Sequence, residues 1–286
     1  MMEWYIGNVW QDKTKGLSKK VMTLQFSSLD KPLPVSSVEF SVKKAPLNLG
    51  ARPSKYLAVS GDGAQQLHSL TMGNATTPID FYLELLLQQF LLGETSTCSI
   101  ETKTGDIIEF QLKLERITSN QQVEKLTAAE IYDLALRYKT NGVAMFKDYP
   151  KFAFDYFIQA AKLLITYKPF DKLTKASNGI DGSEVEALFV QIQTNLAACL
   201  LQEKRYEHVI YHTDFVDTLE NPSEKSVYRR AVAFYHLKEF EKAQRTIERV
   251  PNYEEKREFC KLRDNIATSW KNSDAHYKSV VQRMFS

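Results

Sequence analysis

The chain has 286 residues, with 37 basic and 35 acidic side chains and a formal net charge of +2. This near balance gives no reason to expect binding of nucleic acid or of a membrane surface. Three widely spaced cysteines exclude a disulfide framework, and no apolar run is long enough to span a bilayer. We therefore expect a soluble protein of the cytoplasm, with the nucleus as a second compartment. The only local basic cluster, Lys13, Lys15, Lys19 and Lys20, is too sparse for a nucleic-acid patch and is expected in a solvated loop.

Residues 1–120 show the two-residue period of half-buried strands. In the segment VSSVEFSV, the side chains of Val38, Phe40 and Val42 lie on one face. The segment IIEFQLKLERI alternates more regularly, and KTGD before it is typical of a short hairpin. We therefore expect an antiparallel sheet with one buried face. The apolar positions of the second segment are Ile108, Phe110, Leu112 and Leu114.

One helix is predicted between these strands. Thr77 can cap its first turn, Pro78 suits the first helical position and Gly93 suits the exit. Together with the strands, this helix predicts an α+β domain in which an antiparallel sheet packs against one helix. The apolar side chains that would face the core recur at helical spacing, at Leu83, Leu86, Leu87 and Phe90.

From residue 126 onward the period becomes helical, after a polar linker at residues 119–125. Several helix starts carry capping signals, in which a short polar side chain precedes an acidic residue or a proline. These recurring helix-start signals predict an all-α second domain. The signals are Thr127 with Glu130, Ser183 with Glu186, Asn221 followed by Pro222 and Glu224, and Asn252 with Glu255.

A repeat becomes visible when the helical half is aligned with itself. The segment NLAACLLQEKRYEHV aligns with RRAVAFYHLKEFEKA, so that Ala197 matches Ala231 and Tyr206 matches Phe240, each 34 residues apart. This is the period of the tetratricopeptide repeat, a pair of antiparallel helices that cross at small residues. A third copy with a longer second helix and loop lies upstream, where Gly142 takes the small position.

The repeats are predicted at about 126–170, 184–219 and 222–251, and a final helix at 253–285 would cover the apolar edge of the stack. The chain therefore divides into two predicted domains. Residues 1–120 form the α+β domain, and residues 126–286 form an all-α superhelix of repeats with a C-terminal capping helix.

This order of domains resembles the FKBP-type immunophilins with tetratricopeptide repeats. The segment KSVYRRAVAFYHLKEFEKA is similar to the family's third repeat, QTNLAACLLQEKRY to its second, and HYKSVVQRMF to its closing segment. In the first half, FLLGETSTCSI is similar to the segment that follows the family's helix. The resemblance is specific in the repeats and weak before residue 79, so we expect a degenerate FKBP-like first domain.

The first domain departs from the catalytic members of the family. Leu83 stands where they have the tryptophan at the floor of an apolar pocket, and Leu86 replaces a helix glycine. A tight hairpin between Ile100 and Ile107 replaces a long aromatic loop. Prolyl isomerisation needs a dry aromatic cleft, so we expect no catalytic residues and no cofactor. The length and the degenerate first domain fit a noncanonical member, and this resemblance implies a casein-kinase-type clock kinase as the protein client.

The resemblance also implies a carboxylate clamp in the repeats. Lys225 and Arg229 are four residues apart and share one helical face. In the family, a matching pair helps to hold the acidic C-terminal tail of heat-shock chaperones. Lys139 and Asn195 match two further members of that clamp, whereas Val143 stands where the family has another asparagine. The alternative is that Lys225 and Arg229 form an ordinary solvated face.

The remaining candidates favour packing over chemistry. His208 and His212 share a helical face, but no third ligand is suggested, so we expect no metal site. The leading hypothesis is a noncatalytic adaptor or co-chaperone that binds a client and a chaperone tail, with neither nucleic acid nor membrane as a partner. Two alternatives stay open: a weak peptidyl-prolyl isomerase, and a kinase scaffold with no chaperone link.

Overall fold

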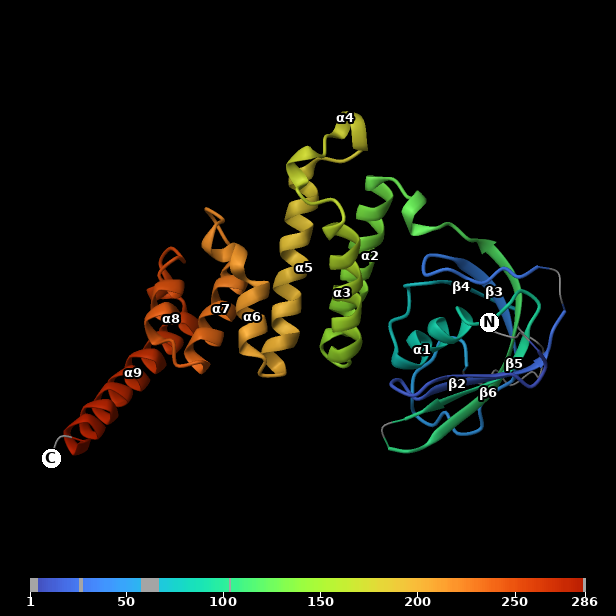
Figure 1. Ribbon diagram of the computed structural model, residues 1–286, viewed down its shortest axis with the longest axis horizontal. Helices are drawn as coiled ribbons and strands as arrows, with labels where there is room; N and C mark the ends of the chain where they lie inside the picture. The colour runs from blue at the N-terminus through green and yellow to red at the C-terminus, as the bar shows by residue number, and fades with distance from the viewer. Residues whose placement is uncertain (1–4, 26–27, 58–66, 103, 285–286) are drawn as a thin grey trace. The chain divides into compact units, whose positions relative to one another are not determined.

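The structure, a computed structural model, describes residues 5–25, 28–57, 67–102 and 104–284. The chain forms two compact units, residues 1–181 and 182–286, which are coloured from blue to yellow-green and from yellow to red in Figure 1. Each unit has a hydrophobic core of its own. The sheet, the first helix pair and the short helix α4 (Lys175–Asn178) therefore belong to one unit, and the helices after residue 181 belong to the other.

The first unit is built on an antiparallel sheet whose strands follow the order β1-β2-β5-β6-β3-β4 (Figure 1). One face of this sheet is buried, because the four apolar side chains predicted on its longest strand, β6, are fully buried. The α+β prediction and the two-residue period are therefore confirmed. The strands are β1 (Val9–Asp12), β2 (Leu17–Thr23), β3 (Ser37–Lys44), β4 (Leu67–Thr71), β5 (Thr95–Glu101) and β6 (Ile107–Ser119).

Helix α1 (Pro78–Leu87) lies against the buried face of the sheet, and its apolar stripe enters the core. The hydroxyl of Thr77 accepts a hydrogen bond from the N–H of Asp80 at 3.2 Å, as its capping position predicts. The helix ends at Leu87, earlier than predicted. Gly93 instead lies in the turn before β5, where its φ of +80° favours glycine.

One lysine of the basic cluster expected in a solvated loop is buried. Lys19 lies on β2 at a position that faces into the first unit, where it forms an ion pair with Glu94. Its ammonium group also lies 4.7 Å from the centre of the Phe90 ring. The prediction was wrong for Lys19 because a charged residue can occupy an inward position of a strand when a buried carboxylate pairs with it.

The first helix pair consists of α2 (Ala128–Phe146) and α3 (Pro150–Ile165). The predicted capping box at its start is present, with Thr127 and Glu130 each accepting a hydrogen bond from the other's backbone N–H. A Cβ atom at Gly142 would lie 2.6 Å from the Phe157 ring. The small residue is therefore required for the close approach of the two helices.

This helix pair is attached to the sheet through the loop formed by residues 73–75. The amide of Asn141 donates to the carbonyl of Gly73 at 2.7 Å, and the hydroxyl of Tyr156 donates to the carbonyl of Ala75 at 2.8 Å. The ring of Tyr138 fills the space that a side chain at position 73 would need. The loop therefore presents its backbone to α2 and α3 at a fixed position.

A buried carboxylate holds the other side of the same loop. Glu84 on α1 accepts hydrogen bonds from the N–H groups of Gly73 at 2.7 Å, Asn74 at 3.1 Å and Ala75 at 2.8 Å. Burial raises the pKa of Glu84 to about 7, although these three donors act in the opposite direction. The loop thus connects α1 to the first helix pair.

The second unit contains two further helix pairs and a long final helix. The predicted repeat is visible in its turns: Lys204 and Lys238, 34 residues apart, both adopt the left-handed conformation, with φ of 58° and 63°. Ala197 and Ala231, the small residues of the two repeats, are fully buried. The helices are α5 (Gly182–Gln202), α6 (Tyr206–His212), α7 (Glu224–His236), α8 (Phe240–Ile247) and α9 (Arg257–Met284).

Three helix starts differ from the predicted ones. Helix α5 already begins at Gly182, so Ser183 lies inside it and is not its cap. Helix α7 is capped by Ser223, which accepts from the N–H of Ser226 at 3.2 Å, and Pro222 precedes the helix. Asn252 has φ of 54°, and a short 3-10 turn separates it from α9. Short polar side chains of this kind also form hydrogen bonds in turns, so their presence near a helix start does not identify the capping residue.

The pH dependence of stability tests the role of Glu84. Its pKa is raised from 4.5 to about 7 on folding, so its stabilising contribution is complete below the unfolded value and is lost as the pH rises through about 7. Between pH 4.5 and pH 8 this loss is about 3 kcal/mol. The variant Glu84→Gln cannot ionise and should lack this component. Chemical denaturation across this pH range measures it; parallel profiles for the two proteins would contradict the prediction.

The left-handed turn at Lys238 gives a second stability prediction. A side chain in this conformation is strained, whereas glycine is not. Lys238→Gly should therefore raise the free energy of unfolding by about 0.5 to 1 kcal/mol. Lys238→Ala is the matched control, because it removes the charge and keeps the Cβ atom. Thermal denaturation compares the two variants, and equal stabilities would show that the turn carries no strain.

Candidate functional site

The candidate site lies on the first helices of the second and third repeats, α5 and α7, within the second unit. Arg229 on α7 donates from Nη1 to the carbonyl oxygen of Thr194 on α5 at 2.6 Å. Thr194 directly precedes Asn195 in the chain. The hydrogen bond therefore ties Arg229 to the turn of α5 that contains Asn195.

The two basic residues of α7 differ in their surroundings. Lys225 is exposed, and it makes no hydrogen bond or ion pair within the part of the chain that the structure describes. Arg229 is half-buried, and burial lowers the pKa of its guanidinium. A charge in such a sheltered position interacts more strongly with an incoming anion than a fully hydrated charge does. One exposed and one sheltered cation, one helical turn apart, can bind two carboxylate groups.

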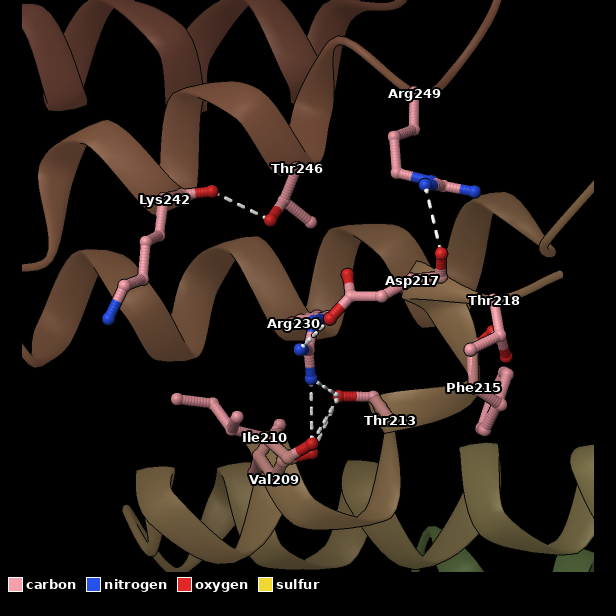
Figure 2. Close-up of polar contacts among 10 residues, drawn as sticks. All are labelled: Val209, Ile210, Thr213, Phe215, Asp217, Thr218, Arg230, Lys242, Thr246 and Arg249. Atoms are coloured by element: carbon pink, nitrogen blue, oxygen red, sulfur yellow. Dashed lines mark hydrogen bonds and ion pairs between the residues drawn. The ribbon is translucent and has the colours of Figure 1, made fainter. Parts of the chain in front are cut away.

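The neighbouring arginine, Arg230, has a structural role that the sequence analysis did not find. Figure 2 shows its guanidinium between α6 and the turn that follows it. It donates to the carbonyl of Ile210 at 2.7 Å and forms an ion pair with Asp217. It also lies 5.0 Å from the centre of the Phe234 ring. Because Arg230 is buried by these contacts, only Arg229 of the Arg-Arg pair is available to a ligand.

A second arginine completes this arrangement. Arg249, which follows α8, donates to the carbonyl of Asp217 at 3.4 Å (Figure 2). It also donates to the carbonyl of Leu219 at 2.7 Å. The connection between α6 and α7 is thus fixed at several backbone carbonyls. This connection precedes Ser223, the cap of α7. The hydrogen bonds of Arg230 and Arg249 therefore help to fix where α7 begins, and with it the positions of Lys225 and Arg229. The only sequence signal for these hydrogen bonds was the second arginine of the RR pair.

Lys139, the fourth predicted residue, lies on α2 in the first unit. It is half-buried and makes no hydrogen bond or ion pair with any described residue. Val143, one turn further along α2, exposes 52% of its surface. The structure therefore brings three of the predicted residues onto adjacent helices of the second unit, Asn195, Lys225 and Arg229, while Lys139 belongs to the other unit.

The first unit shows where the departures from catalytic members lie. Leu83 and Leu86 are fully buried in the core beneath the sheet. The hairpin between β5 and β6 is tight, because the N–H of Thr102 donates to the carbonyl oxygen of Asp106 at 2.9 Å. The position of the pocket floor is thus occupied by aliphatic side chains that pack the core.

His208 and His212, the histidine pair on one helical face, differ in their surroundings. His212 contacts the amide oxygen of Gln193 at 2.5 Å through Nδ1, and His208 is exposed. Burial lowers the pKa of His212. Within the described ranges, no group of three or more His, Cys, Asp or Glu side chains could hold a metal ion. None of the helices in these ranges has the length and apolar character needed to cross a bilayer.

Comparisons with known proteins agree with this architecture. Residues 10–119 match the family model described as BDBT FKBP like N-terminal, and residues 127–211 match Bride of doubletime-like, TPR domain. Protein Bride of doubletime from Drosophila melanogaster is 71% identical over 287 residues, covering all of both chains. A crystal structure of residues 1–211 of CG17282 is 67% identical, with a TM-score of 0.68; it covers 73% of this chain and all of that one. The chain therefore belongs to the Bride of doubletime family, in which an FKBP-like domain precedes tetratricopeptide repeats.

Proposed function

We propose that the chain is a noncatalytic adaptor that binds an acidic C-terminal peptide of the heat-shock-chaperone type through its repeats. The observation that carries this proposal is the arrangement of Asn195, Lys225 and Arg229 on adjacent helices of the second unit. An adaptor role itself follows from the two domains, since both FKBP-like and tetratricopeptide modules bind proteins. The chaperone tail is the finer part of the proposal.

The chemistry of such a tail suits these three side chains. Its last residue offers a terminal carboxylate and an aspartate side chain a few ångströms apart. Arg229 uses one N–H group on the carbonyl of Thr194 and keeps others for a ligand, because a guanidinium has five donors. Lys225 supplies a second cation, and the Asn195 amide supplies a neutral donor. Charge-assisted hydrogen bonds of this kind are short and strong.

The client of the first unit is proposed to be a casein-kinase-type clock kinase. This part rests on the resemblance to noncanonical FKBP-type immunophilins and on the 71% identity to a protein named Bride of doubletime. We propose the cytoplasm as its compartment, with the nucleus as a second one, because its three free cysteines suit a reducing environment. A scaffold that binds a kinase without any chaperone link is the alternative, and peptide binding distinguishes the two.

The absence of isomerase activity is proposed from the first unit. Leu83 and Leu86 fill the core where a catalytic member would have its pocket floor and its helix glycine. At these two positions a substrate proline ring would meet aliphatic side chains and not the aromatic floor of a catalytic member. The alternative, a weak peptidyl-prolyl isomerase, requires a different apolar cleft in this unit.

Peptide titration tests the proposed clamp. A pentapeptide ending in Glu-Glu-Val-Asp with a free carboxylate should bind the full chain, and the same peptide with an amidated end should bind more weakly. Lys225→Ala and Arg229→Ala should each lower the affinity about tenfold to a hundredfold, the value of one charge-assisted hydrogen bond. Isothermal titration calorimetry measures both. Lys271→Ala, an exposed lysine on α9, is the matched control and should leave the affinity unchanged.

The same titration decides between the alternatives. If the unmodified chain fails to bind the free-acid peptide, the clamp is rejected and the scaffold without a chaperone link is favoured. Lys139→Ala reports on the predicted residue of the first unit. A loss of affinity keeps Lys139 in the clamp, whereas unchanged affinity confines the clamp to the second unit.

Isomerase activity can be measured directly on the full chain. Because Leu83 and Leu86 occupy the core at the expected pocket floor, we expect no acceleration of the cis-to-trans conversion of a proline-containing peptide. A protease-coupled assay with a range of residues before the proline gives the rate, and a catalytic FKBP domain serves as the positive control. If the conversion instead becomes faster as the protein concentration rises, the alternative of a weak peptidyl-prolyl isomerase is supported.

A further inference from the structure

Strand β1 is one edge of the sheet, and the hydrogen-bond register shows which of its backbone groups face outward. Val21 donates to the carbonyl of Asn8 at 2.9 Å, and Val9 lies opposite Lys20. On the other side of β2, Glu101 donates to the carbonyl of Gly16 at 2.8 Å. Since bonded and unbonded positions alternate along an antiparallel pair, Val9 and Gln11 direct their N–H and C=O groups away from β2.

Apolar side chains are exposed at this same edge. Tyr5, Ile6 and Val9 expose 54%, 65% and 49% of their surfaces, and Met22 on β2 exposes 41%. Val9 and Met22 lie on one face of the sheet, because Val9 pairs with Lys20, two residues from Met22. Proteins usually protect an edge strand from further pairing with charges, prolines or a covering segment. The apolar edge of β1 favours pairing instead.

The edge is held in a fixed shape by the turn that joins β1 to β2. The carboxylate of Asp12 accepts from the N–H of Thr14 at 3.0 Å, the Thr14 hydroxyl at 2.5 Å and the N–H of Lys15 at 3.2 Å. Gly16 has φ of +64°, and a Cβ atom there would lie 2.9 Å from the carbonyl oxygen of Glu101. A rigid edge loses little conformational entropy when another strand joins it.

The charge of this hairpin selects the kind of strand that can join. Lys13 in the turn and Lys20 opposite Val9 are exposed, and neither forms an ion pair with a described residue. The carboxylate of Asp12 is used within the turn, and Lys19 is neutralised by Glu94. A second copy of the chain would offer the same two lysines and, among the described residues of this hairpin, no unused carboxylate to pair with them. An acidic strand would instead meet complementary charges.

We propose that the edge of β1 is a docking site for an extended acidic segment of another protein, which joins the sheet as an additional strand. Backbone hydrogen bonds to Val9 and Gln11 hold the segment, apolar side chains of the segment cover Val9 and Met22, and its carboxylates pair with Lys13 and Lys20. This is the strand-addition mode of peptide recognition. The site is independent of the proposed clamp, because it uses the middle of a segment and needs no free carboxyl terminus.

The test uses the full chain and a fluorescent capped peptide, acetyl-ETVTETV-amide, which cannot occupy a clamp for a terminal carboxylate. Because side chains alternate along a strand, this peptide presents its glutamates and valines together on the face that Val9, Lys20 and Met22 share. Fluorescence anisotropy should show binding that weakens with salt and is lowered by Lys20→Glu. Gln11→Pro removes only an outward N–H group, which an edge strand tolerates. It should weaken binding about tenfold, whereas Gln11→Ala, the matched control, keeps the N–H group and should bind normally.

Peptide variants distinguish strand addition from simple charge attraction. One is N-methylated at its threonines and one at its glutamates and valines, so each lacks the N–H groups of a single edge. Strand addition predicts that one variant binds and the other does not, and that the exchange of the Val9 and Gln11 amide hydrogens slows when the unmodified peptide binds. Equal binding of the two variants, no binding of the unmodified peptide, or a dimer of the chain that Gln11→Pro dissociates would overturn the proposal.

Discussion

The candidate clamp depends on one hydrogen bond between repeats, from Arg229 to the carbonyl of Thr194. Because its acceptor is a backbone atom, the bond ties the arginine to the course of α5 and not to a mobile side chain. It holds the guanidinium at the turn of α5 that contains Asn195, where Arg229 is partly removed from water. The same bond occupies one donor and leaves the others free, so it orients the arginine without neutralising it.

The adjacent residues Arg229 and Arg230 have different roles: Arg229 contacts α5, and Arg230 contacts α6. On a helix, residues 229 and 230 point about 100° apart, so one can face the neighbouring first helix while the other faces the interior. Arg230 donates to the carbonyl of Ile210 near the end of α6 and pairs with Asp217 in the turn after it. Arg249 donates to a further backbone carbonyl, that of Leu219. Ser223 then begins α7 at a defined place. The positions of Lys225 and Arg229 therefore depend on a stable connection between the two repeats.

Sequence periodicity was sufficient for the fold, and it was insufficient for polar contacts with backbone atoms. The alternation in β6 and the 34-residue offset are properties of side-chain type, so the strands and repeats could be predicted. The carbonyl that accepts from Arg229 and the N–H groups that hold Glu84 belong to residues whose side chains carry no signal of these bonds. Lys19 was missed for a related reason, since its partner Glu94 is distant in the chain.

Helix α1 uses its leucines to fill the core of the first unit. Leucines at positions 83 and 86 bury aliphatic surface where a pocket would expose aromatic rings to water, and burial of such side chains stabilises a domain. Glu84, on the same helix, holds the loop to which α2 and α3 attach. The loop and the helix are thereby held at fixed positions in the first unit. At the edge of the same sheet, strand β1 offers directional backbone hydrogen bonds, which the proposed strand addition would use.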